Sequence, residues 1–348
     1  LGPDVVLAPV VKSNAYGHGI ELASRIFASS GADWLCVHEA NEAAVVVGLD
    51  LGVEVLQLGP VDPHRVDEAL RSGVHLTVSE PERLERILAV STAEKLPAKL
   101  HLKVETGTWR QGADVDRLGR MLEMLGDHAL AEVVGLHSHF ANIEDTTRHE
   151  FATEQFERYG EYLMQVREAG FEPRLRHLAS SAAALLFPHT HLDLVRPGIS
   201  SYGYWPSRET LVSARSTGTD AVRLSPALNW KSRLTEIKPV SAGSFIGYGC
   251  TDKVEVDTNL GIVPVGYADG YRRAMGGRAH VLVRGRVCMN LLMVDVGHVE
   301  GVGVGDEVVL LGRQEEEEIS AELLADWAQT IHYEILAGLN PSIERRRI

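Results

Sequence analysis

Cysteine is scarce in this chain. Of its 348 residues only Cys36, Cys250 and Cys288 are cysteines, and they are far apart in the sequence. Three thiols at these spacings form neither a paired disulfide framework nor a zinc-binding motif, so we expect a protein of a reducing compartment. The sequence also lacks an apolar run of the roughly 18 residues that a membrane-spanning helix needs, and it shows no signal-peptide pattern. We therefore expect a cytoplasmic protein that has no membrane partner.

Basic residues are also scarce, because acidic residues outnumber them. Lysine and arginine total 34, against 48 aspartates and glutamates, which gives a formal net charge of −14. Such a balance argues against a surface that binds nucleic acid or anionic membranes, although it leaves room for a local cationic pocket. No repeat of solenoid period is visible. The length of the chain is enough for about two globular domains.

The first part of the chain alternates between apolar runs and helix-like patterns. Helical periodicity is visible, for example, over residues 81–90, 114–125 and 147–169. Eight strand–helix units predict a (β/α)8 TIM-like barrel over residues 1–215, with a doubly wound open sheet as the alternative. The predicted strands are residues 5–11, 34–38, 53–58, 74–78, 99–104, 132–139, 175–179 and 192–196.

After Gly203 the pattern changes. Residues 206–225 are polar and predict a connection, and beyond Pro226 short β-like runs are separated by glycine and charged turns. A helix is predicted near residues 320–330. We expect a second, mostly β domain over residues 225–348, with strands in residues 230–237, 261–265, 280–287, 291–296 and 307–311.

Lys12 ends the first predicted strand, within the tract VVKSNAYGHG of residues 10–19. The carboxyl end of a barrel strand is where this fold carries its chemistry. A lysine held in an apolar mouth can have a lowered pKa and attack a carbonyl to form a Schiff base. Position alone leaves an alternative open, a solvated lysine whose aliphatic stem is packed.

Other polar side chains also follow predicted strands, and the carboxyl ends of barrel strands meet at one face. Loops after the seventh and eighth strands of barrels often bind phosphate, so a hydroxyl at Ser181 and a close backbone approach at Gly198 fit that role, with Tyr16 adding a phenol. Ser181 as a helix N-cap is the alternative. The residues concerned are Lys103 near the end of the fifth strand and Arg110 beyond it, His139 at the end of the sixth, Ser181 after the seventh, and Arg196 and Gly198 at the end of the eighth and just beyond it.

His137 and His139 invite a metal-binding interpretation, because residues two apart share a face of a strand. No nearby cysteine, aspartate or glutamate completes a ligand set with a recognisable spacing. We therefore predict no metal, and a histidine stacked on a flat cofactor ring fits better.

The tract around Lys12 resembles the pyridoxal-phosphate (PLP) lysine motif of alanine racemases, in which a tyrosine follows the lysine by four residues in a Tyr-Gly-His-Gly turn. Further motifs of that family lie in the predicted β domain, and the resemblance covers nearly the whole chain. They are Tyr248 between two glycines, GYADGY at residues 266–271, GRVCM at residues 285–289, and the pair Tyr333-Glu334.

The resemblance implies a homodimeric, PLP-dependent enzyme that interconverts L- and D-alanine and supplies D-alanine for peptidoglycan. It implies that Lys12 carries the cofactor and that Lys12 and Tyr248, from different subunits, are two bases on opposite faces of the substrate. The implied cofactor contacts are Arg196 at the pyridine nitrogen, His139 against the ring, and Tyr16, Ser181, Ile199 and Tyr333 at the phosphate. Arg110 is expected at the cofactor phenolic oxygen or the substrate carboxylate, oriented by an N-carbamylated Lys103. The Met289 N–H is expected at the substrate carboxylate, and Tyr267 and Asn290 at the entrance.

The chain departs from the family pattern at a few positions. Trp109 and Gln111 flank Arg110 where the family has a small residue and a leucine, and Asn290 replaces an aspartate beside the substrate entrance. Losing that negative charge leaves a serine racemase or a broader specificity open. A decarboxylase of the same architecture and a PLP-binding protein without activity are further alternatives. The GYADGY segment disfavours the first, and the extra domain with Tyr248 disfavours the second.

Overall fold

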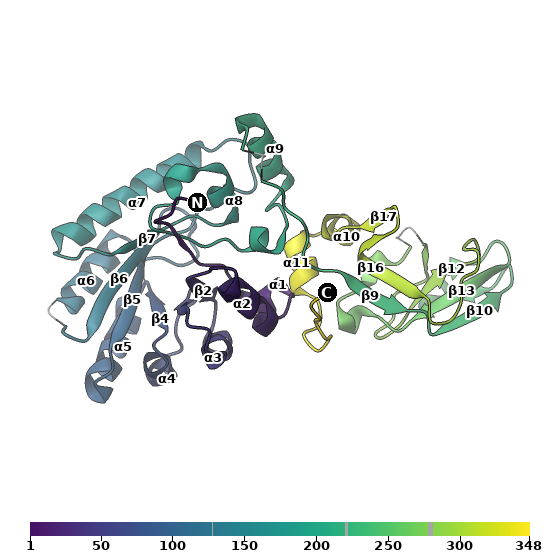
Figure 1. Ribbon diagram of the computed structural model, residues 1–348, viewed down its shortest axis with the longest axis horizontal. Coiled ribbons are helices and arrows are strands. Elements are labelled where there is room, and N and C mark those ends of the chain that lie inside the picture. The colour runs from purple at the N-terminus through teal and green to yellow at the C-terminus, as the bar shows by residue number, and fades with distance from the viewer. Residues whose placement is uncertain (127, 220–221, 278–280) are drawn as a thin grey trace. The chain divides into compact units, whose positions relative to one another are not determined.

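The computed structural model describes residues 1–126, 128–219, 222–277 and 281–348 (Figure 1). The chain forms two compact units. The first contains Leu1–Ala15 and Gly19–Pro226, and the second contains Tyr16–His18 and Ala227–Ile348. The short segment Tyr16–His18 therefore belongs with the second unit, although its neighbours in sequence belong to the first. Among the described helices, none has the length and hydropathy of a membrane-crossing segment.

The first unit is a parallel (β/α)8 barrel, as the alternating pattern predicts. Strands β2 to β7 form one sheet in chain order, and β1 pairs with β8 in parallel. Backbone hydrogen bonds close the ring on both sides of this pair, from Val11 N–H to the Cys36 carbonyl and from Arg196 N–H to the Ala179 carbonyl. The strands are β1 (Val6–Leu7), β2 (Trp34–Val37), β3 (Glu54–Gln57), β4 (His75–Val78), β5 (Ala98–Lys103), β6 (Ala131–His137), β7 (Leu175–His177) and β8 (Leu194–Val195).

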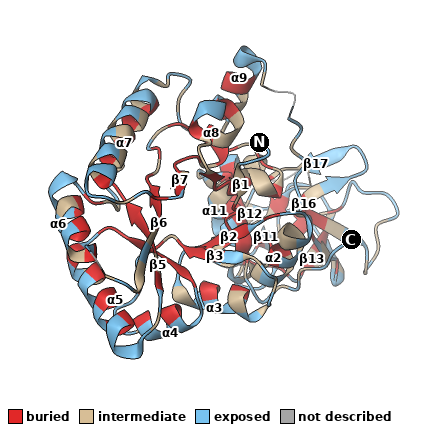
Figure 2. Ribbon diagram, turned by 60° about the vertical axis from the view of Figure 1, so that its left-hand side comes forward, coloured by how far each residue is buried: buried red, intermediate tan, exposed pale blue. Residues whose placement is uncertain are grey.

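Amphipathic helices cover the outside of the barrel. Helix α6 shows the cause, because its buried residues Leu118, Met121, Leu122 and Leu125 recur at helical spacing and face the strands. Figure 2 shows the strands buried and the helices exposed on their outer faces. The helices are α2 (Ile20–Ser29), α3 (Ala40–Gly48), α4 (Val66–Arg71), α5 (Pro81–Glu94), α6 (Val115–Leu125), α7 (Glu150–Glu168), α8 (Ser181–Leu186) and α9 (Arg208–Thr217), with short 3-10 turns η1 (Pro188–Thr190) and η2 (Ile199–Tyr202).

The second unit is mostly antiparallel β. One four-stranded sheet has the order β10 (Glu236–Val240), β13 (Thr258–Val263), β15 (Leu292–Asp295) and β14 (Val283–Arg284). A three-stranded sheet has the order β17 (Glu317–Ile319), β16 (Glu307–Gln314) and β9 (Trp230–Arg233), and β11 (Phe245–Ile246) pairs with β12 (Asp252–Lys253). Helices α10 (Ala321–Ala328) and α11 (His332–Ala337) and the 3-10 turns η3 (Tyr248–Cys250), η4 (Tyr267–Asp269) and η5 (Arg273–Met275) complete it.

Two of the strand predictions in this unit need comment. The single strand expected over residues 230–237 is two strands, β9 and β10, which belong to different sheets. The chain changes sheet at the buried Leu234, where no glycine or proline marks a turn. The strand expected over residues 280–287 begins at His280, which lies outside the described residues, and its described part contains β14.

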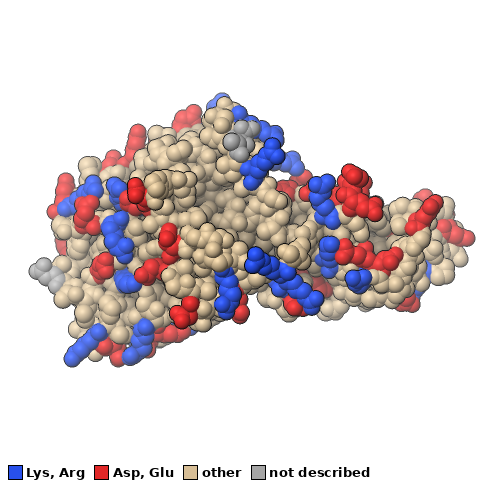
Figure 3. Space-filling view, viewed as in Figure 1, with Lys and Arg blue, Asp and Glu red and all other residues tan. Residues whose placement is uncertain are grey.

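Charged side chains of both signs are interspersed over the surface in view in Figure 3. Some form ion pairs between exposed residues, such as Arg65 with Glu68 at 2.7 Å and Lys231 with Glu307 at 2.8 Å. Exposed pairs of this kind each contribute about 1 kcal/mol or less. The fold is therefore held mainly by the buried apolar side chains of the first unit and by the smaller core of the second unit.

Candidate active site

Lys12 directly follows the first strand and opens a backbone turn of unusual geometry. Ser13, Asn14, Ala15 and Tyr16 all have φ between 51 and 54°, so the turn labelled α1 (Lys12–Tyr16) is left-handed. Left-handed backbone costs a residue other than glycine about 1–2 kcal/mol. Such strain persists only where the surroundings enforce it, and it concentrates at functional sites.

Helix α3 supplies one restraint on this turn through Glu42. Its Oε1 accepts a hydrogen bond from the Ser13 N–H at 2.5 Å, and its Oε2 accepts one from the His38 N–H at 2.7 Å. Asn14 closes the other end of the turn, because its side-chain oxygen accepts from the Ile20 N–H at 2.9 Å. Glu42 could not be predicted from the sequence, because no motif distinguishes it from the other surface glutamates.

Five side chains predicted from the sequence influence one another electrostatically at the carboxyl end of the barrel: Lys12, Lys103, Arg110, His139 and Arg196. Burial and the neighbouring Arg110 lower the pKa of Lys12. Burial, Arg196 and Arg110 lower the pKa of Lys103 to about 7. Burial and Arg196 hold the pKa of His139 well below its usual range. The barrel mouth thus combines amines of lowered basicity with fixed cations, which suits an anionic carbonyl ligand.

Lys103 is buried and donates to the Gln111 Oε1 at 3.0 Å. The Gln111 Nε2 is also buried, and it has no hydrogen-bond partner within the described part of the chain. A buried donor without an acceptor is costly. An additional oxygen atom beside Lys103 would satisfy it.

The loops after β7 and β8 are tied together by Ser181. Its hydroxyl oxygen accepts from the backbone N–H groups of Gly198 at 2.9 Å and Ser200 at 3.2 Å. Ser180, not Ser181, occupies the N-cap position of α8. Ile199 opens the next 3-10 turn, so the predicted phosphate residues Ser181, Gly198 and Ile199 lie in one small backbone cluster.

Arg196 follows β8 and is only 4% exposed. Its guanidinium donates to the carbonyls of Ser138 at 2.8 Å, Leu178 at 3.3 Å and His177 at 3.1 Å, and it also contacts the His177 ring. No ion pair joins it to a carboxylate in the ranges that the structure describes. Burial lowers the pKa of Arg196 to about 10, so the side chain stays cationic near neutral pH.

The end of the Lys12 tract is part of the second unit. The rings of Tyr16 and Tyr333 have centroids 6.1 Å apart, and the Gly17 carbonyl accepts from Arg345 Nε at 2.9 Å. A Cβ at Gly17 would lie 1.9 Å from the Leu336 carbonyl oxygen, so only glycine fits there. The structure therefore brings together the two tyrosines predicted at the phosphate, Tyr16 and Tyr333.

The remaining predicted residues lie on exposed turns of the second unit. Tyr248 is 67% exposed in η3, and Met289 and Asn290 are exposed as well. Backbone bonds from Tyr267 N–H to the Cys288 carbonyl and from Ala268 N–H to the Met289 carbonyl hold the GYADGY and GRVCM segments side by side. The predicted entrance residues Tyr267 and Asn290 are thus on adjacent turns.

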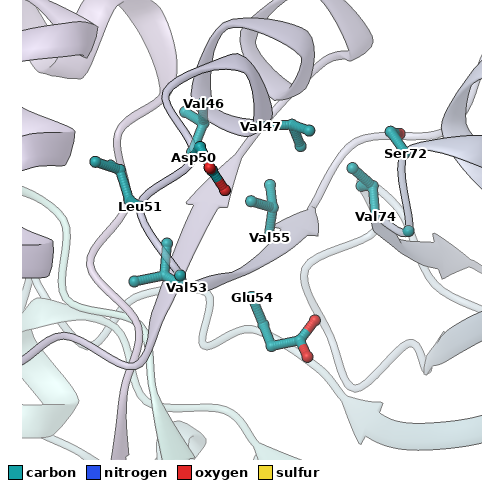
Figure 4. A pocket seen from close by; sticks show the side chains of 11 residues that line it. Val46, Val47, Asp50, Leu51, Val53, Glu54, Val55, Ser72 and Val74 are labelled. Carbon is teal, nitrogen blue, oxygen red and sulfur yellow. The ribbon is translucent and has the colours of Figure 1, made fainter.

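A cavity of about 180 Å³ lies at the other end of the barrel, among the residues that precede β3 and β4 (Figure 4). Apolar side chains such as Val46, Val53 and Val55 form much of its lining, together with Asp50 and Glu54. The amino-terminal face of a barrel serves stability rather than catalysis. We therefore do not assign the substrate to this cavity.

Comparison with known proteins agrees with these motifs. Residues 1–206 match the family description "Alanine racemase, N-terminal domain", and residues 227–347 match "Alanine racemase, C-terminal domain". The alanine racemase of Leptospira interrogans serogroup Icterohaemorrhagiae serovar Lai is 37% identical, over 99% of this chain and 90% of the relative. That of Desulforamulus reducens is also 37% identical, over 99% of this chain and 92% of the relative.

Solved structures of alanine racemases are also similar to this chain. The alanine racemase from Bacillus anthracis with bound L-Ala-P superposes with a TM-score of 0.91 at 31% identity, covering 98% of this chain and 87% of the other. The alanine racemase of Clostridium difficile 630 in complex with cycloserine superposes with a TM-score of 0.88 at 27% identity, covering 98% and 88%. The chain belongs to the alanine racemase family and is an isomerase, as the motifs around Lys12 and Tyr248 predict.

Proposed function

We propose that this protein is a PLP-dependent alanine racemase of the cytoplasm that supplies D-alanine for peptidoglycan. In this proposal residues 1–215 bind the cofactor, and residues 225–348 supply the second catalytic base. Alanine as substrate is supported by the named relatives and by the ligands L-Ala-P and cycloserine in the two related structures. The observation that carries the proposal is Lys12, an amine of lowered pKa held on a strained turn at the barrel mouth.

The donor set fits PLP. Lys12 would hold its carbonyl carbon, Arg196 would face the pyridine nitrogen, and His139 would lie against the ring. The cluster of Ser181, Gly198 and Ile199, with Tyr16 and Tyr333, would hold the phosphate through hydroxyl and backbone N–H donors. When bound, PLP would supply an electron sink that acidifies the Cα–H of an amino acid. A buried cation, rather than a carboxylate, beside the ring nitrogen keeps that sink weak and limits side reactions.

Racemisation needs a proton removed from one face of Cα and returned on the other. Lys12 can accept this proton at Nζ near neutral pH, because burial and Arg110 lower the pKa of the Lys12 ammonium. We propose Tyr248 of the partner subunit as the second base, with its phenol oxygen at the opposite face. Its high exposure in a single chain supports a role that a second copy completes. The homodimer would then be obligatory for activity.

Arg110 and the Met289 N–H would bind the substrate carboxylate. We propose that the Lys103 amine adds to CO₂, losing one proton, and that the resulting carbamate orients Arg110. Two observations support this step: the pKa of Lys103, lowered to about 7 by burial and by Arg196, and the buried Gln111 Nε2, which needs an acceptor. Tyr267 and Asn290 would border the entrance, where the neutral Asn290 leaves serine open as a second substrate.

A panel assay separates this function from its alternatives. The purified protein is incubated with L- and D-forms of alanine, serine, lysine and arginine, and the products are resolved by chiral chromatography. We expect racemisation with the highest kcat/KM for alanine. Release of an amine and CO₂ would identify a decarboxylase, and bound PLP without turnover of any substrate would identify a cofactor-binding protein.

A further inference from the structure

A line of hydrogen-bonded polar side chains crosses the interior of the barrel beneath Arg196. It consists of Glu54, His75, His101, His177 and Arg196, and we call it the histidine column. His75 Nε2 lies 3.2 Å from Glu54 Oε2, and His75 Nδ1 lies 3.1 Å from His101 Nε2. His101 Nδ1 lies 2.9 Å from His177 Nε2, and His177 Nδ1 contacts the Arg196 guanidinium.

The strands place these residues along the barrel from one end to the other. Glu54 and His75 are the first residues of β3 and β4, at the amino-terminal face where Glu54 borders the cavity of Figure 4. His177 is the last residue of β7, and Arg196 follows β8 at the catalytic face. The three rings are completely buried. Barrel interiors are usually filled by branched apolar side chains, so three buried histidines in successive edge-to-face contact require a reason beyond packing.

The surrounding residues leave room for the column. Gly135 is the partner of His101 in the pairing of β5 with β6, and a Cβ there would lie only 2.3 Å from His101 Nδ1. The Trp34 ring packs edge-on against His75 and His101, with centroids 4.4 and 5.7 Å away. The rings are thus fixed by their neighbours as well as by each other.

The two ends of the column determine where its protons lie. A guanidinium has donors only, so His177 Nδ1 must accept from Arg196. A neutral imidazole has one donor and one acceptor, so His177 donates from Nε2 to His101 Nδ1. By the same reasoning His101 Nε2 donates to His75 Nδ1. His75 Nε2 then donates to the carboxylate of Glu54, and every bond runs from the cation toward the anion.

The charges at each end agree with this assignment. Burial lowers the pKa of His101 and His177 well below the usual range, and burial together with Lys99 lowers the pKa of His75 to about 4, so the rings are neutral. Burial alone would raise the pKa of Glu54, but hydrogen bonds from Lys99 and His75 lower it on balance. Glu54 is therefore an ionised acceptor.

We propose that the histidine column is a one-directional chain of neutral imidazoles that holds Arg196 in place, with Glu54 as its terminal acceptor. Glu54, His75 and His101 are then positioning residues that act on the site through Arg196. The link to catalysis rests on the proposed function, in which Arg196 faces the cofactor ring nitrogen. The column does not conduct protons, because the guanidinium remains protonated; it aligns dipoles that stabilise a buried cation.

The first test determines which ring nitrogens of the histidines carry protons in the cofactor-free protein. Long-range ¹H–¹⁵N spectra of [¹⁵N]histidine-labelled protein report which ring nitrogen of each histidine is protonated. We expect His75, His101 and His177 to carry the proton on Nε2 at every pH from 6 to 9. A proton on Nδ1 of any of the three, or an imidazolium, overturns the proposal. This measurement needs no turnover, so it stands apart from the assay of racemase activity, whose failure would overturn the proposed function alone.

The second test uses Glu54→Gln, with Glu132→Gln as the matched control. Both glutamates have half-exposed or exposed side chains and a basic partner, but Glu132 pairs with Arg174 at 3.7 Å and does not touch the column. An amide both donates and accepts, so it no longer fixes the direction of the chain. We expect Glu54→Gln to shift the ¹⁵N signals of His177 at the far end and to lower kcat about two- to thirtyfold, with KM little changed. No effect of Glu54→Gln, or an equal effect of Glu132→Gln, overturns the proposal.

Discussion

Replacing Glu42 with alanine tests the idea that the left-handed turn presents Lys12 for chemistry. Glu42 is the acceptor for the Ser13 N–H at 2.5 Å and for the His38 N–H at 2.7 Å. An intramolecular hydrogen bond contributes a net of about 0.5–1.5 kcal/mol to stability, and more when one partner is charged. Ser13 and His38 are exposed enough to find water, so we expect a value within this range for each bond, about 2 kcal/mol for both together.

The strain in the turn determines how it responds to the loss of these hydrogen bonds. Ser13, Ala15 and Tyr16 are left-handed at about 1–2 kcal/mol each, so roughly 3–6 kcal/mol is stored there. Losing about 2 kcal/mol of restraint lets the turn relax and exposes Lys12. Burial is the largest cause of the lowered Lys12 pKa, and the Glu42 charge acts more weakly in the opposite sense. The exposure effect therefore dominates, and the pKa of Lys12 should rise.

Urea denaturation and a pH profile of kcat/KM measure both consequences. We expect Glu42→Ala to lower the unfolding free energy by about 2 kcal/mol and to move the acid limb of the profile to higher pH, because the amine must lose its proton to act. Glu21→Ala is the matched control on the neighbouring helix α2, because Glu21 is exposed and is not one of the charges that shift the pKa of Lys12. An acid limb that moves to lower pH would show that only charge was lost and would refute the argument from strain.

Three further outcomes follow from the proposed chemistry. Tyr248→Phe should slow racemisation by about 10²–10⁴-fold and leave PLP bound, and near-normal rates in both directions by stopped assay would remove Tyr248 from the mechanism. Mixing Lys12→Ala with Tyr248→Phe protein should restore about a quarter of wild-type activity after free subunit exchange, since half the dimers are hybrid with one intact site each; verified hybrids without activity would place both bases in one chain. In protein whose Lys103 is not carbamylated, burial and Arg196 lower the pKa of the folded-state amine from 10.5 to about 7. The unfolded chain then binds more protons between these two values, so stability should rise with pH across this window, and Lys103→Met should flatten the rise in urea titrations.

The barrel was predictable because strands that are buried on both faces appear in the sequence as apolar runs. Residues 34–38 and 74–78, for example, correspond to Trp34–Val37 and His75–Val78 in the structure. The division of residues 230–237 between two sheets was not predictable. Leu234 is buried and apolar at the change of sheet, so the local pattern there matches a continuous strand.

The site was predictable only where a motif or a strand end marked a residue. Lys12 and Arg196 each end an apolar run, and their convergence follows from barrel geometry. The left-handed turn could not be read from Ser13 and Ala15, because neither residue favours positive φ. One of its restraints is the contact of Ser13 with Glu42, 29 positions away, which only the fold establishes.

The histidine column was missed for a related reason. His101 and His177 are 76 positions apart, and the sequence does not report the register that brings their nitrogens within 2.9 Å. A signal was present, since polar histidines interrupt four successive apolar strands. Recognising it requires the assumption that these histidine side chains point into the barrel.

Lys103 makes the choice of Lys12 as the cofactor lysine directly testable. It also lies at the barrel mouth, and burial with Arg196 and Arg110 lowers its pKa to about 7, so it is a chemical competitor for the carbonyl of PLP. Holoprotein reduced with borohydride and mapped by peptide mass spectrometry locates the fixed cofactor. We expect a phosphopyridoxyl group on Lys12 and none on Lys103. A modified Lys103, or an unmodified Lys12 in fully reduced holoprotein, would contradict it.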